Sequence, residues 1–551
     1  MSCNSVCEIV SKTNKFVMKR ESLPIICVLL FIALNSSGRE PLANEGKSGL
    51  YVQSIQQVLQ LKEQEVDLAT AVLIASEYWN DNVPGRRYLT KLDSIALEIR
   101  TRLQSRNLRA NEEAVAVINK YLFGELGFKP TKQENDPDDL FLHSVLDRRQ
   151  GQCLGLSILY LAIGERLGLP LYGVVVPGHF FIRYDDGWMR FNIETTSKGG
   201  FVENEYYISK YNVPQCNNDS IYMINLNKIQ TLGCFFNNLG SSYYKVGDRE
   251  LALAAYKGAV QINPLLAEAR ANLANVYLDM GQTERAITEC ETAVNINPGN
   301  ANARNSLGNA YTAQGSLDKA ISQYHQSLEL SPSSIYVYEN LAIVYCKQRE
   351  FDHARSVLNQ AIVLDPKNAA LYNQLGNIDR QMNDYKKAIR KYRKALEIKN
   401  DLADANFGLA LCYHKLGLID YEIRAYKRVL AVEPDMIAAL INLGAAYAYK
   451  QNYVAAVTEF KKALQLKPHD PAIHYNLGVT YSNKTDYEQS AAEYLKAIEI
   501  EPEMAEAHRN LGFVFYKLNE YNLAWKHIKI AHRLGVNIDE GLISAVKHKL
   551  K

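Results

Sequence analysis

Over residues 233–538 of this 551-residue chain, apolar positions recur with a period of 34 residues. Each unit holds a leucine, a small residue directly after it and an aromatic residue three places further on, except that Asp379 takes the aromatic place once. Residues at these spacings share one face of a helix, and the small residue lets a second helix approach closely. The leucines are Leu239, Leu273, Leu307, Leu341, Leu375, Leu409, Leu443, Leu477 and Leu511. The pattern predicts nine consecutive helical pairs.

The second half of each unit carries alanines at helical spacing and usually ends at a proline. Proline lacks an N–H and disfavours helix in the residue before it, so it marks the end of the second helix. The prolines are Pro264, Pro298, Pro332, Pro366, Pro434, Pro468 and Pro502, with Asn400 in the one interrupted position. This is the pattern of the tetratricopeptide repeat (TPR). It predicts an all-α TPR solenoid over 233–538 and a capping helix over 539–551.

An asparagine directly precedes the leucine in six of the nine units. These residues are Asn238, Asn272, Asn340, Asn442, Asn476 and Asn510. Asparagine is unfavourable inside a helix unless its side chain has a role. We interpret the series as a groove whose amides bond to the backbone of an extended peptide; the alternative is a set of solvated positions without a role. The partner is then a protein or peptide.

The TPR array resembles that of the eukaryotic O-GlcNAc transferases in this asparagine series. An O-GlcNAc-transferase-like function is nevertheless the less favoured interpretation. Only a short amphipathic stretch follows Leu534, and we expect no glycosyltransferase domain there.

Between residues 50 and 225 the pattern is mixed and predicts an α+β domain. An apolar helix starts at Cys153 and is ended by Gly168 and Pro170, and alternating apolar positions follow it. The expected elements are helices over 91–103, 112–128 and 153–167 and strands over 172–177, 179–184 and 188–196. The whole chain is expected to be mostly α-helical.

Four residues of this domain suggest nucleophilic chemistry. Cys153 begins a helix, where the helix dipole and free backbone N–H groups stabilise a thiolate. His179 opens a strand and could act as its base. Asn192 and Glu194 lie two residues apart on one face of the next strand, so either could orient the histidine.

Ordered blocks over about residues 65–200 resemble the bacterial SirB family. The blocks are LDSIALEIRTRL, YLFGELGF, VLDRRQGQCLGLSILYLAIGERLGLPL and PGHFFIRY. The SirB N-terminal domain belongs to the transglutaminase-like superfamily, with a papain-like fold and a Cys-His-Asp triad, and TPR repeats commonly follow it. The resemblance implies that Cys153 is the nucleophile and His179 the base. The third position matches Glu194 by its E-T-T context, or Asn192; neither is the family's aspartate.

Charge and cysteine spacing exclude several classes of function. The net charge is +2, and acidic and basic residues are interspersed rather than gathered in a basic stripe, so no nucleic-acid partner is expected. The nine cysteines show neither a C-x-x-C pair nor zinc-binding spacing. We therefore expect no metal and no cofactor.

The first 45 residues differ from the rest of the chain. An apolar run of 11 residues, 24–34, follows Lys19 and Arg20. It is too short to span a bilayer but suits a secretory signal. We expect a signal peptide or signal-anchor over 1–45, with Met18 as an alternative start. The protein would be exported, periplasmic or envelope-associated, alternatively cytoplasmic, and would touch the membrane only through an uncleaved N-terminal segment.

Two functions fit these features. In the first, the Cys-His domain is an amide hydrolase or acyltransferase, and the solenoid binds its protein or peptide partner. In the second, an inactive domain and the solenoid together form a non-catalytic scaffold.

Overall fold

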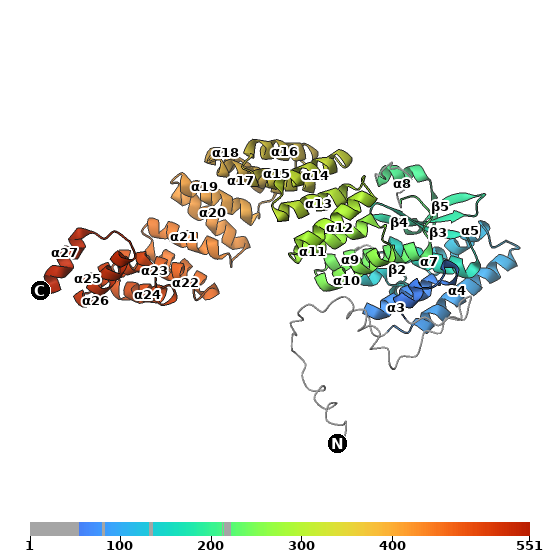
Figure 1. Cartoon of the computed structure of the whole chain (residues 1–551), viewed down its shortest axis with the longest axis horizontal. Coiled ribbons are helices and arrows are strands. Elements are labelled where there is room, and N and C mark those ends of the chain that lie inside the picture. The colour runs from blue at the N-terminus through green and yellow to red at the C-terminus, as the bar shows by residue number, and fades with distance from the viewer. Residues whose placement is uncertain (1–53, 80–82, 132–135, 212, 214–221, 551) are drawn as a thin grey trace, which may run out of the picture. The chain divides into compact units, whose positions relative to one another are not determined.

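The computed structural model describes residues 54–79, 83–131, 136–211, 213 and 222–550, which are coloured in Figure 1. A region of helices and strands comes first, and the described residues from α9 onward contain helices and their connections. The predicted fold class, an α+β domain followed by an all-α TPR solenoid, is confirmed. The chain divides into two compact units between Lys319 and Ala320.

The predicted signal segment, 1–45, lies outside the described residues. Within the described ranges, no helix combines the length and the apolar character needed to cross a bilayer.

Helix α7 is the centre of the α+β domain, which we call the head. Most of its side chains are buried, as expected for a helix that is apolar on all sides. Gly168 ends it in the left-handed conformation, with φ at 75°, as the sequence predicts. The head helices are α2 (Ile55–Leu59), α3 (Leu68–Trp79), α4 (Gly85–Ser105), α5 (Glu113–Asn119), α6 (Leu142–Arg148), α7 (Cys153–Leu167) and α8 (Asn204–Lys210).

An antiparallel sheet of four strands packs on α7. The strands lie in chain order and are β3 (Leu171–Val176), β4 (His179–Asp185), β5 (Arg190–Glu194) and β6 (Gly200–Val202). The first three were expected, whereas three-residue β6 is too short for a period-2 pattern to reveal. A second, parallel pair consists of β1 (Lys129–Pro130) and β2 (Gln150–Gly151), and β2 directly precedes α7.

Different helices pack on the two faces of the sheet. Phe180, Ile182 and Ile193 share a core with α7. On the other face, Phe181 stacks on Tyr207 of α8 with ring centroids 3.8 Å apart. Because side chains alternate along a strand, His179 has the same orientation as Phe181 and lies toward α8.

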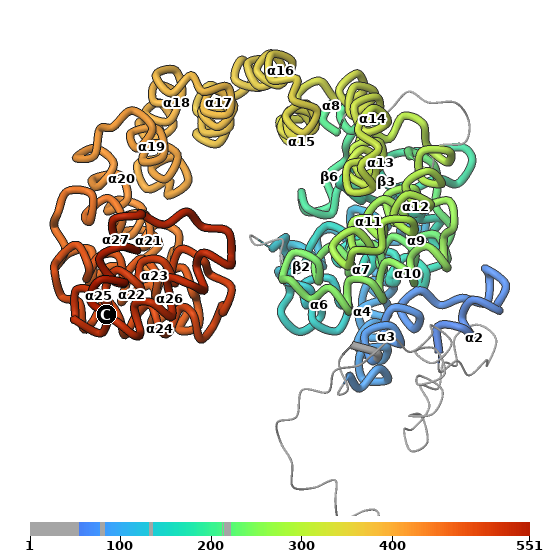
Figure 2. The backbone as a smooth tube through the Cα atoms, turned by 60° about the vertical axis from the view of Figure 1, so that its left-hand side comes forward, coloured from blue at the N-terminus to red at the C-terminus, as the bar shows by residue number. Residues whose placement is uncertain are grey.

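Nine helical pairs follow the head, and within each unit successive helices stack as neighbours (Figures 1 and 2). The first helices of the pairs are α9 (Lys228–Lys245), α11 (Ala267–Asp279), α13 (Ala301–Gln314), α15 (Ile335–Lys347), α17 (Ala369–Gln381), α19 (Ala403–Lys415), α21 (Ile437–Tyr449), α23 (Pro471–Asn483) and α25 (Ala505–Lys517). The second helices are α10 (Arg249–Ile262), α12 (Thr283–Ile296), α14 (Leu317–Leu330), α16 (Phe351–Leu364), α18 (Tyr385–Ile398), α20 (Ile419–Val432), α22 (Tyr453–Leu466), α24 (Tyr487–Ile500) and α26 (Tyr521–Arg533). The last helix is α27 (Glu540–Leu550).

Helix α9 belongs to both the head and the solenoid. Its Leu232 and Phe235 lie in the same core as α7, and Phe235 meets Phe141 edge-on at 6.1 Å. Lys228, the first residue of α9, bonds to the Glu165 carboxylate at the end of α7. The first repeat and the head therefore share one continuous core.

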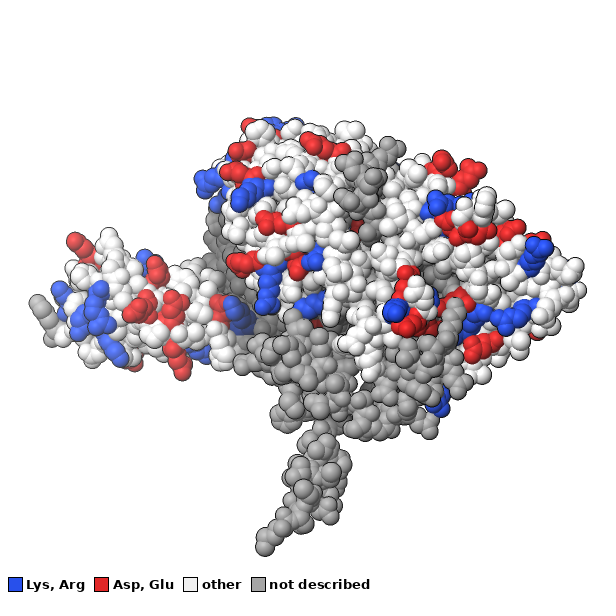
Figure 3. Space-filling model, turned by 45° about the vertical axis from the view of Figure 1, so that its right-hand side comes forward, with Lys and Arg blue, Asp and Glu red and all other residues white. Residues whose placement is uncertain are grey.

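Acidic and basic side chains are interspersed on the face that Figure 3 shows. Many charged side chains of the described residues pair, as in Lys91 with Asp147 at 3.2 Å and Arg249 with Asp279 at 2.8 Å. Exposed ion pairs of this kind contribute little to stability, so they do not explain what holds the fold together. They do explain why charges of both signs lie side by side on the surface.

Candidate functional site

Close packing fixes the first turn of α7, where Cys153 lies. A Cβ at Gly155 would be 2.7 Å from the Asp139 carbonyl oxygen, and one at Gly151 would be 2.8 Å from Val145. The backbone N–H of Gln152 donates to the same Asp139 oxygen over 3.0 Å. The glycines on either side of Cys153 therefore let this turn sit directly against the preceding segment, and Cys153 is a half-buried free thiol.

His179 lies between Cys153 and Glu194. Its Nε2 donates to Glu194 Oε2 over 2.7 Å, and the Cys153 side chain lies near enough to raise the pKa of the ring. Because Nε2 faces Glu194, the ring nitrogen left for the sulfur is Nδ1. The side chains of His179 and Glu194 are only 10% and 6% exposed, so bulk water screens this pair weakly.

The electrostatics of the three groups favour a charged pair. Burial lowers the pKa of His179, but the hydrogen bonds and charges of Cys153 and Glu194 outweigh it and raise the value to about 9. Burial acts to raise the pKa of Glu194, yet His179 and Thr196 hold it below its ordinary value. At neutral pH the site therefore holds an imidazolium beside a carboxylate.

Two tyrosines also contact the His179–Glu194 pair. Tyr207 donates its hydroxyl to Glu194 Oε2 over 3.0 Å, and Tyr211 stacks on the imidazole with centroids 4.9 Å apart and ring planes 2° from parallel. The sequence analysis missed both residues. Their spacing of four residues is typical of one helix face, but nothing in it reveals that this face covers the sheet.

Asn192 has different partners from Glu194. Its side-chain oxygen accepts from Arg183 Nε over 2.9 Å, and its nitrogen donates to the Val202 carbonyl and to Asn204 Oδ1, both over 2.9 Å. The structure brings together Cys153, His179 and Glu194, and it places Asn192 in a separate network around Arg183. The alternative in which Asn192 orients His179 is therefore corrected in favour of Glu194.

The six asparagines of the solenoid are half-buried, and several bridge consecutive repeats. Asn272 donates to Asn237 Oδ1 over 3.0 Å. Asn442 lies near Tyr426, and Asn510 donates to Tyr475 over 3.1 Å and to Tyr494 over 3.3 Å. In the described residues, Asn238 and Asn476 have no such side-chain bond, whereas Asn340 has interactions of its own.

The sequence analysis missed this bridging role. Its signal was available, because Tyr426 and Tyr494 each precede an asparagine of the series by 16 residues. At Gly408 the series is interrupted, and the hydroxyl of Tyr392, 16 residues earlier, instead donates to Asn377 over 2.7 Å.

Replacing Asn510 by alanine is expected to lower the free energy of unfolding by about 1 kcal/mol, because it removes two hydrogen bonds between repeats. The matched control is Asn476→Ala in the preceding repeat, which should change it by less than about 0.5 kcal/mol. Native-state hydrogen exchange of the amides in α23, α24 and α25 compares them, because it reports the free energy of local unfolding. Equal effects of the two variants would contradict the bridging role.

Family models match both parts of the chain. Residues 86–223 match the model of the transglutaminase-like superfamily. TPR models match residues 243–310, 308–349, 376–417, 446–485 and 484–519.

Curated relatives match part of the chain, and those of the UPF0162 group cover the N-terminal domain. A UPF0162 protein of Xylella fastidiosa is 34% identical over 123 residues, 22% of this chain and 43% of that protein. The mouse F-box only protein 21 is 34% identical over 109 residues, 20% of this chain and 16% of that protein. The chain thus spans less than half the length of these relatives. Among solved structures, that of MamA is 29% identical and covers 29% of this chain and 95% of its own, with a TM-score of 0.28.

The assignment to the SirB family stays a prediction. The two sets of family models support a more general statement, that this chain contains a transglutaminase-like domain and that tetratricopeptide repeats follow it.

Proposed function

We propose that the head is a cysteine-dependent amide hydrolase or acyltransferase. The observation that carries the proposal is the position of His179, which lies near the Cys153 side chain and donates a hydrogen bond to the Glu194 carboxylate. This is the arrangement that an activated thiolate needs: a base within hydrogen-bond reach, and a third group that orients the base. Cys153 would be the nucleophile, His179 the general acid and base, and Glu194 the positioning residue.

The chemistry follows from the protonation states. The Cys153 thiolate attacks the carbonyl carbon of an amide, and His179 gives its proton to the departing nitrogen, so that an amine leaves and a thioester remains. Water or a second amine then attacks the thioester while His179 removes its proton. The acid or new amide leaves, and Cys153 returns as the thiolate with His179 protonated. Glu194 transfers no proton; it holds the imidazole and stabilises its charge.

The solenoid would recruit an extended peptide. In α15, Asn340 is flanked one turn away by Tyr336 and Ile343, which are 45% and 47% exposed. An amide next to exposed apolar side chains on one helix face supplies both the backbone contacts and the side-chain contacts that peptide recognition uses.

Thiol alkylation tests the head without knowledge of its substrate. The intact chain is treated with iodoacetamide at pH 6.5, and mass spectrometry reports the rate at each cysteine. We expect Cys153 to react at least about tenfold faster than glutathione, because a free thiol is only about 1% ionised at that pH. His179→Ala should abolish the advantage. A Cys153 that reacts no faster than glutathione would contradict the proposal and favour the non-catalytic scaffold.

The titration of His179 gives a second prediction. Its midpoint is expected at about pH 9, and Glu194→Gln should lower the midpoint because it removes a carboxylate that raises this pKa. Protonated His179 contributes stability that is fully present below about pH 6.5, the pKa of an unpaired imidazole, and that is lost as the pH rises through about 9. NMR on histidine labelled with carbon-13 measures the midpoint, and the missing peak in His179→Asn identifies the residue. A midpoint near 6.5 in the unsubstituted protein would contradict the charged pair.

A further inference from the structure

Repeat five differs from its neighbours at one buried position. In repeat four, Tyr345 fills this position, with its hydroxyl 3.1 Å from His325 Nε2 and its ring stacked on His353. In repeat six, the ring of Tyr413 lies tilted against Tyr421 with centroids 5.3 Å apart, and its hydroxyl accepts from Arg393 over 3.0 Å. The smaller Asp379 takes the place of the aromatic ring in repeat five, and a pocket of about 400 Å³ lies there.

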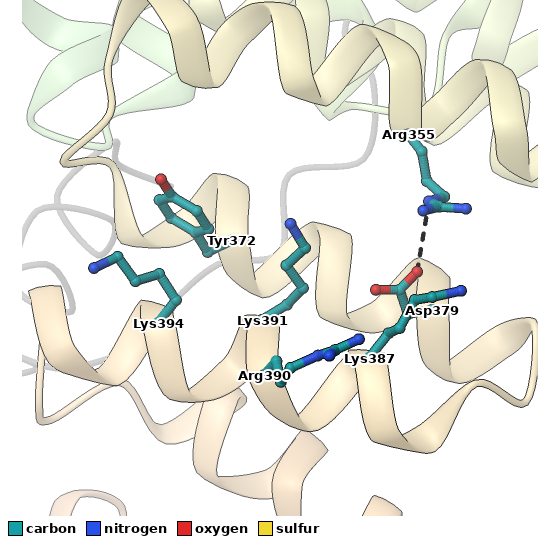
Figure 4. Close-up of a pocket in the computed structure, with 7 residues that line it drawn as sticks. All are labelled: Arg355, Tyr372, Asp379, Lys387, Arg390, Lys391 and Lys394. Carbon is teal, nitrogen blue, oxygen red and sulfur yellow. Dashed lines mark ion pairs between the residues drawn. The ribbon is translucent and has the colours of Figure 1, made fainter.

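Basic side chains from two helices line this pocket, which we call the repeat-five pocket (Figure 4). Arg355 reaches down from α16 to the buried Asp379 of α17, with Nε 3.5 Å from Oδ1. Helix α18 adds Lys387, Arg390, Lys391 and Lys394 on the other side. Five cations and one carboxylate thus line the same pocket.

Part of this positive charge has no counterion within the protein. Lys387 pairs with Asp384 at 2.6 Å and Lys394 with Glu397 at 3.0 Å. Arg390 and Lys391, by contrast, make no ion pair with any residue that the structure describes.

The basic residues of α18 also repel one another. Lys387 and Lys391 are one turn apart, as are Arg390 and Lys394, and like charges at this spacing destabilise a helix. A negatively charged group bound in the pocket would reduce this repulsion between the basic side chains of α18. Two unpaired positive charges match one group that carries two negative charges.

We propose that the repeat-five pocket binds a phosphate monoester. Its dianion neutralises Arg390 and Lys391 together, which a single carboxylate does not. The guanidinium of Arg390 can donate two parallel hydrogen bonds to phosphate oxygens, and Lys391, which points into the space between α16 and α18 in Figure 4, supplies a point charge. The half-buried Tyr372 borders the remaining space, which leaves room for the carbon atoms that carry the phosphate.

The phosphate can come from a phosphorylated peptide or from a small free phosphate. The proposal is independent of the cysteine chemistry, because every residue it uses lies in the second compact unit.

Two variants of the intact chain test the pocket by different routes. Arg390→Gln with Lys391→Gln removes the unpaired charges. Asp379→Tyr instead restores the aromatic residue of the other repeats and fills the pocket while it keeps all five cations. The matched control, Lys461→Gln with Lys462→Gln, removes two lysines from α22, outside the pocket. Thermal unfolding checks that each variant is folded.

Fluorescence anisotropy with a labelled alanine–glycine heptapeptide that carries one phosphoserine gives the readout. We expect both pocket variants to weaken binding at least tenfold and the control to change it less than twofold. The same peptide with serine or glutamate in place of phosphoserine should bind at least tenfold more weakly. Competition by free phosphoserine at the concentration at which the phosphopeptide itself competes would identify a small phosphate monoester as the source; failure to compete there identifies the phosphopeptide.

Two results would overturn the proposal. The first is a phosphopeptide affinity that Asp379→Tyr leaves unchanged, since surface charge alone would then explain binding. The second is equal affinity for the glutamate peptide, which would mean that any acidic segment suffices.

Discussion

Replacing Cys153 by alanine is expected to abolish acyl transfer, with a loss on the order of 10³-fold or more, as removal of a catalytic nucleophile typically produces. The assay follows ammonia release from a glutamine peptide for hydrolysis and incorporation of dansylcadaverine into that peptide for transfer. Because Cys153 is a half-buried residue at the start of α7, its thiol contributes little to the core. The variant should therefore keep the circular dichroism spectrum and melting temperature of the unsubstituted protein.

The chain offers a matched control for this change. Cys346 in α15 is also a half-buried free thiol, and Cys346→Ala should leave both activities within twofold. Glu194→Gln keeps the shape of the side chain but removes the charge that stabilises the imidazolium, so about a 10²-fold loss is expected. If Cys153→Ala retains the full rate of ammonia release, the chemistry does not pass through this residue.

Replacing Gly408 by valine is expected to disrupt the solenoid locally at repeats five and six. A Cβ at Gly408 would be 2.4 Å from the ring of Tyr392, and one at Gly376 would be 2.7 Å from the same ring. The ring is fully buried, and its hydroxyl is held by Asn377, so it has no free direction in which to move. We expect the local free energy of opening to fall by about 3 kcal/mol, at the upper end of the cost of overpacking.

Hydrogen exchange measures this effect, because a solenoid opens repeat by repeat rather than in one transition. Amides of α18 and α19 should exchange faster, and those of α25 should be unchanged. Ala445→Val in α21 introduces the same side chain at an exposed position and serves as the control. Tyr392→Leu should partly rescue Gly408→Val, since it removes the ring that the valine meets. Unchanged exchange in α18 would mean that the ring is free to move.

The solenoid could be predicted almost completely from sequence, because its determinants are local. Leucine, small residue and aromatic residue at fixed spacing specify each helix pair without knowledge of distant contacts. Cys153 and His179 could be singled out for a similar reason. Each is the first residue of a helix or strand that the adjacent stretch of sequence predicts.

What the sequence left open depends on how elements pack. Asn192 and Glu194 share one strand face, and the antiparallel register that pairs Arg183 with Asn192 decides between them. Tyr207 and Tyr211 reach His179 only because α8 covers that face of the sheet. The aspartate in repeat five is visible as a departure from the pattern, but the basic residues around it come from two other stretches of the chain.

The shared core of α9 and the head has a consequence for where a stable fragment can begin. Solenoids need a polar cover over each terminal repeat, because a repeat with no neighbour exposes its apolar face. Leu232 and Phe235 present such a face, and the head covers it. The transglutaminase-like domain is therefore also the N-terminal cap of the array. A fragment cut at Lys228 would expose this surface to water, so the minimal soluble form of the first repeats includes the head.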